Sequence, residues 1–328
     1  MKNKYRNIFL AFGIVAVLIM IFTFDMDYQE LWANLKRAGV YLPLVLLLWL
    51  FVYLINTTSW YIIIRSGGKP GFSFARLYKF TVTGFALNYV TPVGLMGGEP
   101  YRIMELKPYI GVERATSSVI LYVMMHIFSH FCFWLSSVLL YLCLYPVGWV
   151  MGTILGTITV FCLLVAMLFV KGYQHGMAVA FVRLGSHLPF LKKKVIRFAD
   201  SHREQLENID KQIALLHQQK KGAFYAALFL EYTARVVSCL EIWLILNVLT
   251  RSVSFADFCL SAAFSSLLAN LLFFLPMQLG GREGGFALAV GGLSLSGAYG
   301  VYAALITRVR EMVWIVIGLA LMKVGNKK

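Results

Sequence analysis

Two short segments of the sequence combine helix-breaking residues with charged residues of both signs. The first segment carries Glu99 and Arg102, which are one helical turn apart, beside a proline- and glycine-rich break at residues 91–100. The second segment carries Arg282 and Glu283 inside a similar break. Arginine side chains and the free N–H groups of a helix N-terminus both suit an anionic group such as phosphate. The structural alternative is that the acid and the arginine of each segment form an ion pair that only holds the local chain in place.

Candidate binding residues at the two breaks are of two kinds. Polar and charged side chains would contact a ligand, whereas prolines and glycines would break the helices and allow close approach. The first break contributes Asn88, Pro92, Gly94, Gly97, Gly98, Glu99 and Arg102, and the second contributes Asn270, Pro276, Gly280, Gly281, Arg282 and Glu283.

The composition indicates that these segments lie in a membrane. Hydrophobic residues make up 59% of the 328 residues and charged residues 14%, whereas soluble domains average about 45–50% and about 25%. The net charge is +15. In a membrane protein, basic residues collect on the cytoplasmic side and meet anionic lipid, so we expect no nucleic-acid partner.

Six apolar stretches are long enough to span a bilayer, which takes about 20 residues. They cover residues 8–24, 41–64, 115–144, 149–170, 222–249 and 297–324. The broken segments 74–107 and 255–295 are predicted to be re-entrant hairpins. This arrangement places both termini and the basic loop 171–221 in the cytoplasm, in agreement with the positive-inside rule. The expected fold is therefore an all-α, multi-pass helical protein of the cell membrane, with six spanning helices and two re-entrant hairpins.

The two broken segments resemble each other. The tripeptide Ser-Phe-Ala opens both, and Gly-Gly-Glu in the first matches Gly-Gly-Arg-Glu in the second, at an offset of 181 to 184 residues. We therefore predict one membrane domain, residues 1–328, built as an inverted repeat. Residues 40–145 form the first repeat, 146–221 an extra span and the basic loop, and 222–325 the second repeat. Inverted repeats with broken helices are typical of transporters, whose binding site lies near the midplane.

Other polar residues within the spans have simpler interpretations. Glu231 and Arg235 are four residues apart on one helix, which predicts a structural ion pair. His126 and His130 have the same spacing, which can bind a metal. No third ligand lies nearby in the sequence, so we expect histidines that pack in the core or line a cavity.

The paired motifs resemble the lysylphosphatidylglycerol synthase transmembrane region family. The residues that carry the resemblance are Asn88, Pro92, Gly94, Gly97-Gly98-Glu99-Pro100 and Arg102, followed by Pro276, Gly280-Gly281-Arg282-Glu283. The resemblance implies a flippase-like membrane region and adds Arg308 to the candidate site. It puts His126 at the equivalent place in the first repeat. Two-domain members also carry a soluble synthase domain, and we expect this chain to be a stand-alone member without one.

The predicted function is therefore the movement of a polar or anionic phospholipid, or of a lipid-linked sugar, between leaflets. Its partners would be membrane lipids with anionic or zwitterionic head groups and a lipid-modifying enzyme. No ATP-binding P-loop occurs in the sequence, so we expect no cofactor and a passive or ion-coupled process. Two alternatives remain open: an intramembrane enzyme with Glu99 or Glu283 as acid–base, and a scaffold that docks a synthase through residues 171–221.

Overall fold

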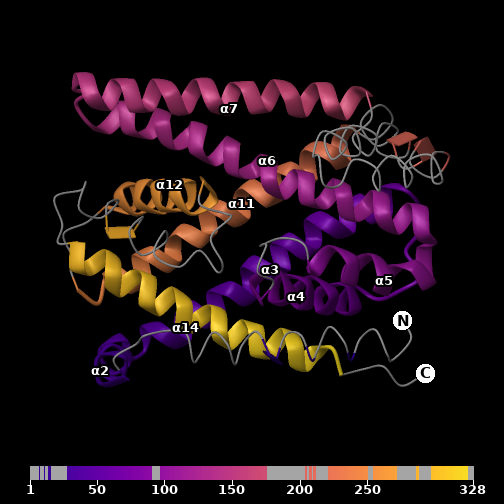
Figure 1. Cartoon of the computed structure of the whole chain (residues 1–328), viewed down its shortest axis with the longest axis horizontal. Coiled ribbons are helices and arrows are strands. Elements are labelled where there is room, and N and C mark those ends of the chain that lie inside the picture. The colour runs from indigo at the N-terminus through magenta and orange to yellow at the C-terminus, as the bar shows by residue number, and fades with distance from the viewer. Residues whose placement is uncertain are drawn as a thin grey trace, which may run out of the picture.

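The chain folds as a bundle of α-helices (Figure 1). The computed structural model describes residues 28–90, 97–175, 221–249, 254–271 and 297–323, and single positions at 7, 11, 14, 15, 204, 207, 208, 210, 211, 286 and 287. Within these residues there is no strand. The prediction of an all-α, polytopic membrane protein is confirmed.

Long apolar helices dominate the bundle. Three described segments are long and apolar enough to cross a membrane: Tyr41–Ser66, Val112–Leu144 and Trp149–Phe169. Two further helices have 26 and 25 residues, or about 38 Å at 1.5 Å per residue, but they carry buried charges. The predicted span 8–24 lies almost wholly outside the described residues. The helices are α2 (Tyr28–Ala38), α3 (Tyr41–Ser66), α4 (Phe74–Val90), α5 (Gly98–Ile110), α6 (Val112–Leu144), α7 (Trp149–His175), α11 (Lys221–Leu246), α12 (Phe255–Leu271) and α14 (Gly297–Leu321).

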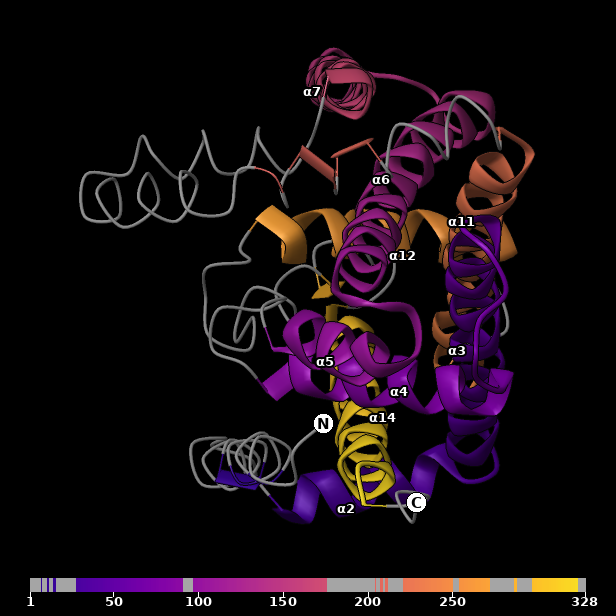
Figure 2. The ribbon, with the colours of Figure 1, turned by 90° about the vertical axis from the view of Figure 1, so that its right-hand side faces the viewer.

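Helices α3 and α11 lie side by side as an antiparallel pair (Figure 2). Theirs is the most extensive contact between two described helices, and it joins the two halves of the chain. Three hydrogen bonds establish the direction. From one end to the other they join Ser59 to Ala227, Asn56 to Glu231 and Trp49 to Glu241. The residue number falls along α3 as it rises along α11, so the two helices run in opposite directions.

Helices α4 and α5 form an antiparallel helical hairpin. Hydrogen bonds between them join Asn88, near the end of α4, to Gly98 at the start of α5, and Thr81 to Arg102 further along. Near the open end of the hairpin, Arg76 donates to the Tyr109 hydroxyl at 2.9 Å. These three hydrogen bonds connect the two helices from one end to the other, so α4 and α5 pack as one unit.

The packing of the short helices crosses from one half of the chain to the other. Helix α4 packs on α14, where the Thr83 hydroxyl donates to the Gly318 carbonyl at 3.0 Å. Helix α12 packs on α6, where the Trp134 indole donates to the Ser266 hydroxyl at 2.9 Å. In each case a helix of one half is therefore held against the last long helix of the other half.

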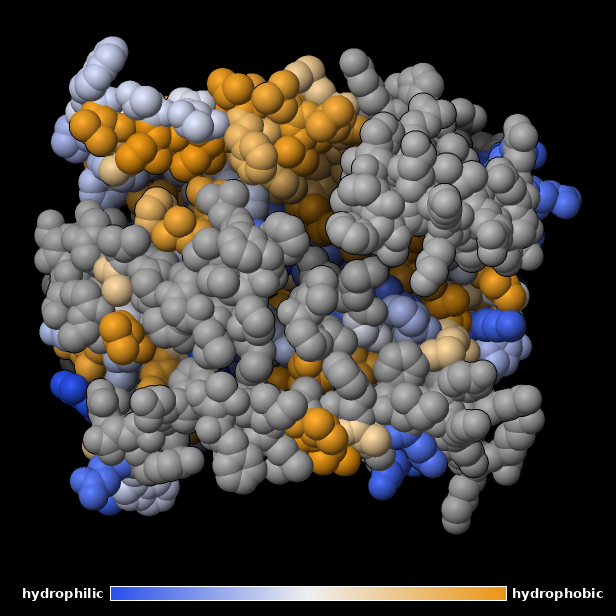
Figure 3. Space-filling view, in the orientation of Figure 1, coloured by the Kyte–Doolittle hydropathy of each residue, from blue (hydrophilic) through white to orange (hydrophobic). Residues whose placement is uncertain are grey.

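Two helices lie at the edge of the bundle. Helix α7 packs on α6 and presents exposed apolar side chains such as Val160, Leu164 and Leu168. Apolar surface gathers at the top of Figure 3, where Figure 1 places α7. The sequence analysis did not predict α2, a short helix in which Lys36 lies over the exposed Trp32 ring at 5.3 Å. Tryptophan and lysine together are typical of helices at a membrane surface.

Candidate functional site

Residues 97–100 of the first predicted break lie at the start of α5, next to the end of α4. The Asn88 side-chain oxygen accepts a hydrogen bond from the Gly98 N–H at 2.7 Å, and its amide donates to Glu99 Oε1 at 2.9 Å. Asn88 therefore satisfies one of the free N–H groups at the start of α5 and orients the carboxylate beside it. The negative charge of Glu99 in the first turn also complements the helix dipole.

Arg102 is a buried cation with few firm partners. Its side chain is 1% exposed, and its two hydrogen bonds are long: 3.4 Å to Glu99 Oε1 and 3.3 Å to the Thr81 carbonyl oxygen. A guanidinium has five N–H donors, and the Arg102 Nε donor has no partner in the described residues. The guanidinium is thus held in place while much of its capacity to bind an anion is unused.

Aromatic rings surround the Arg102 guanidinium on several sides. Its carbon lies 4.8 Å from the Phe85 ring centre, 5.2 Å from that of Tyr122 and 5.7 Å from that of Trp60. Rings at these distances stabilise a cation by about 0.5–2 kcal/mol each. Three helices other than α5 supply them, so the position of Arg102 is fixed by the tertiary fold.

Two glycines allow α4 and α5 to approach closely. A Cβ on Gly98 would overlap the backbone oxygen of Gly84, and a Cβ on Gly84 would overlap the Arg102 guanidinium. Any larger residue at either position would force the helices apart or displace the arginine. The glycines are therefore required by the geometry that buries Arg102.

A second polar cluster joins α3, α6 and α11. The Glu231 carboxylate is fully buried, and its Oε2 accepts hydrogen bonds from His126 Nδ1 at 2.8 Å and from the Asn56 amide at 2.9 Å. Arg235 Nη2 lies 2.6 Å from His126 Nε2. No direct ion pair joins Glu231 to Arg235 among the described residues, so the predicted pair is wrong. The reason is tertiary: α6 places the His126 ring between the two charges.

The two polar clusters are connected through aromatic rings. The His126 ring centre lies 5.4 Å from that of Phe85 and 6.2 Å from that of Tyr122. Both of these rings also contact Arg102. The hairpin cluster around Arg102 and the His126 cluster therefore belong to one continuous buried region.

A third cluster joins α3, α11 and α14. Arg310 donates to both Glu241 oxygens, at 2.8 and 3.1 Å, and the Trp49 indole donates to Glu241 Oε2 at 2.9 Å. The guanidinium also stacks on the Trp49 ring at 3.8 Å. Both charges are at least nine-tenths buried. This bidentate geometry, with each carboxylate oxygen satisfied, is typical of a structural ion pair.

Seven of the fourteen predicted site residues lie in the part of the chain that the structure describes. The structure brings Asn88, Gly97, Gly98, Glu99 and Arg102 together at the start of α5. Asn270 lies near the end of α12 and donates to the Ser266 carbonyl at 2.7 Å, and Arg308 is buried on α14. The remaining seven lie outside the described residues: Pro92, Gly94, Pro276, Gly280, Gly281, Arg282 and Glu283.

Several residues of the buried region were not predicted to be part of a site. They are Asn56, Phe85, Trp60 and Tyr122, and only Asn56 carried a usable signal, because it is an amide inside an otherwise apolar span. His126 and His130 were expected in the core or in a cavity wall, and both lie against buried side chains. Among the described residues, no three histidine, cysteine or acidic side chains come together as a metal site would require.

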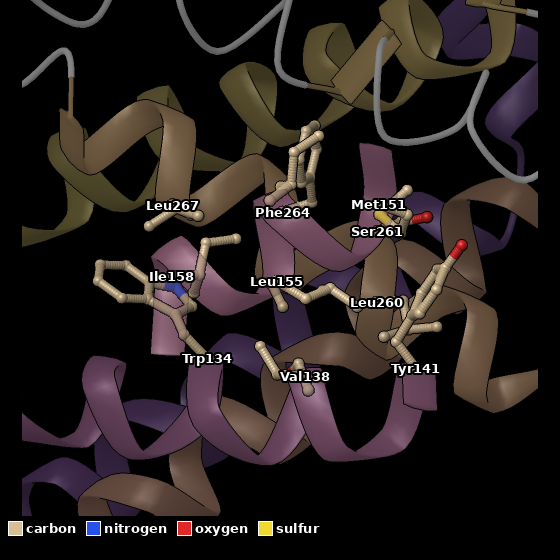
Figure 4. A pocket seen from close by; sticks show the side chains of 13 residues that line it. Trp134, Val138, Tyr141, Met151, Leu155, Ile158, Leu260, Ser261, Phe264 and Leu267 are labelled. Carbon is tan, nitrogen blue, oxygen red and sulfur yellow. The ribbon is translucent and has the colours of Figure 1, made fainter. Parts of the chain in front are cut away.

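An apolar pocket lies away from the charged clusters, between α6, α7 and α12 (Figure 4). Its volume is about 140 Å³. Trp134 from α6, Leu155 from α7 and Phe264 from α12 point into it, and Ser261 and Tyr141 bring hydroxyl groups to its wall. No predicted site residue lines it. Its lining suits hydrocarbon better than a charged group.

Comparison with known proteins gives one match. The sequence profile described as the lysylphosphatidylglycerol synthase TM region matches residues 8–319. The match includes the helices from α2 to α12 and most of α14. No curated protein and no solved structure matches the chain.

Proposed function

Because this chain belongs to the lysylphosphatidylglycerol synthase TM region family, an integral membrane family of lipid metabolism or transport, we propose that it moves a lipid between leaflets. The lipid has an anionic or zwitterionic head group, and its phosphate binds at Arg102. Glu99 positions the guanidinium, while the acyl chains remain in the surrounding bilayer. The proposed activity is transport without a change in the chemistry of the lipid.

The observation that carries this proposal is that Arg102 is buried and has only long hydrogen bonds. A buried cation normally requires firm partners, because its desolvation is costly, yet the two hydrogen bonds of Arg102 are 3.3 and 3.4 Å long. A phosphate oxygen would supply the short, charge-assisted hydrogen bonds that the guanidinium lacks. The apolar pocket beside α7 supports a lipid as the ligand, because its lining suits an acyl chain.

We also propose that the two halves form an inverted repeat. Two observations support this: α3 runs antiparallel to α11, and the short helix of each half packs on the last long helix of the other. A pseudo-two-fold axis in the membrane plane would produce both features. The site would then lie between the repeats, within reach of each leaflet in turn.

In the proposed orientation, both termini and residues 171–221 lie in the cytoplasm of a cell-membrane protein. A cysteine that replaces Gly39, between α2 and α3, should then be labelled by an impermeant maleimide added outside intact cells. A cysteine that replaces Gln218 should be labelled only after the cells are permeabilised. Labelling of the second cysteine from outside would overturn the orientation and with it the re-entrant hairpins.

The transport proposal is tested with purified protein in vesicles. Three kinds of fluorescent lipid would be placed in the inner leaflet: an anionic phospholipid, a zwitterionic phospholipid, and a cationic lipid without phosphate. Their arrival in the outer leaflet would be measured with an impermeant quencher. We expect the lipids that contain phosphate to move faster than in protein-free vesicles and the cationic lipid not to. Mass spectrometry of the recovered lipids would show whether any has been altered, as an enzyme would require. Equal rates with and without protein for every lipid would contradict the proposal.

A further inference from the structure

Glu231 is a fully buried carboxylate whose two oxygens are used unequally; Glu99 Oε2 also lacks a partner among the described residues, but the Glu99 side chain is 20% exposed. The Oε2 of Glu231 accepts two hydrogen bonds, whereas its Oε1 is buried without a partner in the described part of the chain. Ser59 lies beside the carboxylate, but its hydroxyl donates to the Ala227 carbonyl at 3.0 Å. A fully buried carboxylate oxygen that receives no donor is costly, by about 1–3 kcal/mol or more. A proton on Oε1 would neutralise the buried charge and leave the existing hydrogen bonds in place.

Arg235 fixes the tautomer of His126 in this cluster. A guanidinium can only donate, so the His126 Nε2 that lies 2.6 Å from Arg235 must be an acceptor. The single ring proton is then on Nδ1 and is donated to Glu231 Oε2 at 2.8 Å. With the carboxylate ionised, the charges of Glu231 and Arg235 balance. One added proton gives the cluster a net charge of +1.

A partly exposed path leads from the outside of the cluster to Glu231. The His126 side chain is 19% exposed, whereas that of Glu231 is 0% exposed. His130 follows one turn later on α6, with its ring centre 5.7 Å from that of His126. The His130 Nδ1 also has no partner among the described residues. His126 is therefore the partly exposed neighbour of the buried carboxyl, and His130 lies one turn further along α6.

We propose that Glu231 Oε1 is a proton-binding site, and that proton binding there is coupled to head-group binding at Arg102. The proton comes from water on one side of the membrane and is released to water on the other. The coupling rests on the proposed transport function, whereas the proton site itself does not. Because the added proton raises the positive charge of the buried region, it strengthens anion binding, and the bound anion in turn favours the proton.

The other charged groups around the cluster are consistent with a single proton acceptor. Arg235 and Arg102 interact electrostatically with the Glu231 carboxyl, and Tyr122 interacts electrostatically with both Glu231 and Arg102. On α4, Tyr89 acts on Arg235. None of these groups occupies Oε1.

Charged side chains of α12 and α14, which pack on α6 and α11, bind partners other than Glu231. Arg310 of α14 binds Glu241 and lies 3.8 Å from Glu311, about 15 Å along α11 from Glu231 at 1.5 Å per residue. On α12, Asp257 bonds to Tyr145 beyond the end of α6. The described side chains of α7 carry no charge. Glu241, both of whose oxygens are occupied, is therefore the matched control for Glu231.

Infrared spectroscopy tests the proton site without reference to transport. Reconstituted protein should show a protonated-carboxyl C=O band that grows as the pH falls. Glu231→Gln should remove the band, while Glu113→Gln and the folded fraction of Glu241→Gln should keep it. An unchanged band in folded Glu231→Gln protein would overturn the proposal.

Dicyclohexylcarbodiimide, an apolar reagent for protonated carboxyl groups, gives a test on the unmodified chain. Peptide mass spectrometry should find the adduct on Glu231, in rising amount at lower pH, and not on Glu241. An adduct on Glu241 alone would overturn the proposal in the same way.

Lipid transport under a pH gradient tests the coupling. With one proton moved per lipid, a gradient of one pH unit supports up to about a tenfold difference in lipid between leaflets. Glu231→Gln should abolish this accumulation. If the unmodified protein has the titrating band and moves lipid, but accumulates none under the gradient, the coupling is wrong. If it has the band and moves no lipid, the transport proposal fails while the proton site stands.

Discussion

Replacing Arg102 with glutamine should lower lipid transport by about 10- to 150-fold. The estimate corresponds to the loss of a charge-assisted hydrogen bond worth about 1.5–3 kcal/mol. The Arg102 guanidinium is buried and has an Nε donor without a partner, so an incoming phosphate would depend on it directly. The measurement is the initial rate of lipid movement in vesicles. Arg102→Lys should recover only part of the rate, because an ammonium keeps the charge but lacks the planar fork.

Arg114 provides a matched control for this prediction. Its guanidinium also bonds to backbone carbonyls, at Ile64 and Gly68, but it lies at the start of α6 away from the aromatic rings around Arg102. Arg114→Gln makes the same chemical change and should leave the rate per folded molecule unaltered. If Arg102→Gln loses thermal stability in detergent and its activity falls only in proportion, Arg102 has a structural role instead.

Removing either partner of the Glu241–Arg310 pair should cost about 3–5 kcal/mol of unfolding free energy. Glu241→Gln leaves Arg310 buried without its bidentate acceptor, and Arg310→Gln leaves Glu241 with only the Trp49 indole as a strong donor. The measurement is denaturant unfolding in detergent. The double variant should lose less than the sum of the two single losses, because it leaves no unbalanced charge in the interior.

Glu113 is the control carboxylate for this experiment. It lies at the start of α6, is only partly buried, and has an amide partner at 3.5 Å. Glu113→Gln should change the unfolding free energy by no more than about 0.5 kcal/mol. Losses below about 1 kcal/mol for both Glu241→Gln and Arg310→Gln would show that this ion pair does not hold α3, α11 and α14 together.

The contacts of the hairpin cluster join residues that are close together in the sequence. Asn88, Glu99 and Arg102 lie within 15 residues of one another, on either side of a break, and a helical hairpin brings such residues together whatever the rest of the chain does. The helical class also followed from composition, because long apolar segments in a bilayer must satisfy their backbone groups internally.

Contacts between distant helices could not be predicted in the same way. Spacing on α11 alone favoured a direct pair of Glu231 with Arg235, but His126, 105 residues from Glu231, lies between them. Arg310 and Glu241 are 69 residues apart, and the three rings around Arg102 come from α3, α4 and α6. The spacing of residues along one helix does not specify which side chains of other helices will lie beside it.

The antiparallel pair of α3 and α11 also affects how the protein is made. The partners Asn56 and Glu231 are 175 residues apart, and Trp49 and Glu241 are 192 apart. At about 5–20 residues per second of synthesis, α3 spends roughly 10 to 35 s in the membrane before α11 exists. During that interval its amide and indole have no native carboxylate to bind. The first half of the chain therefore remains an unfinished intermediate throughout synthesis, and its polar groups must be sheltered by lipid head groups, by water or by the insertion machinery until the second half arrives.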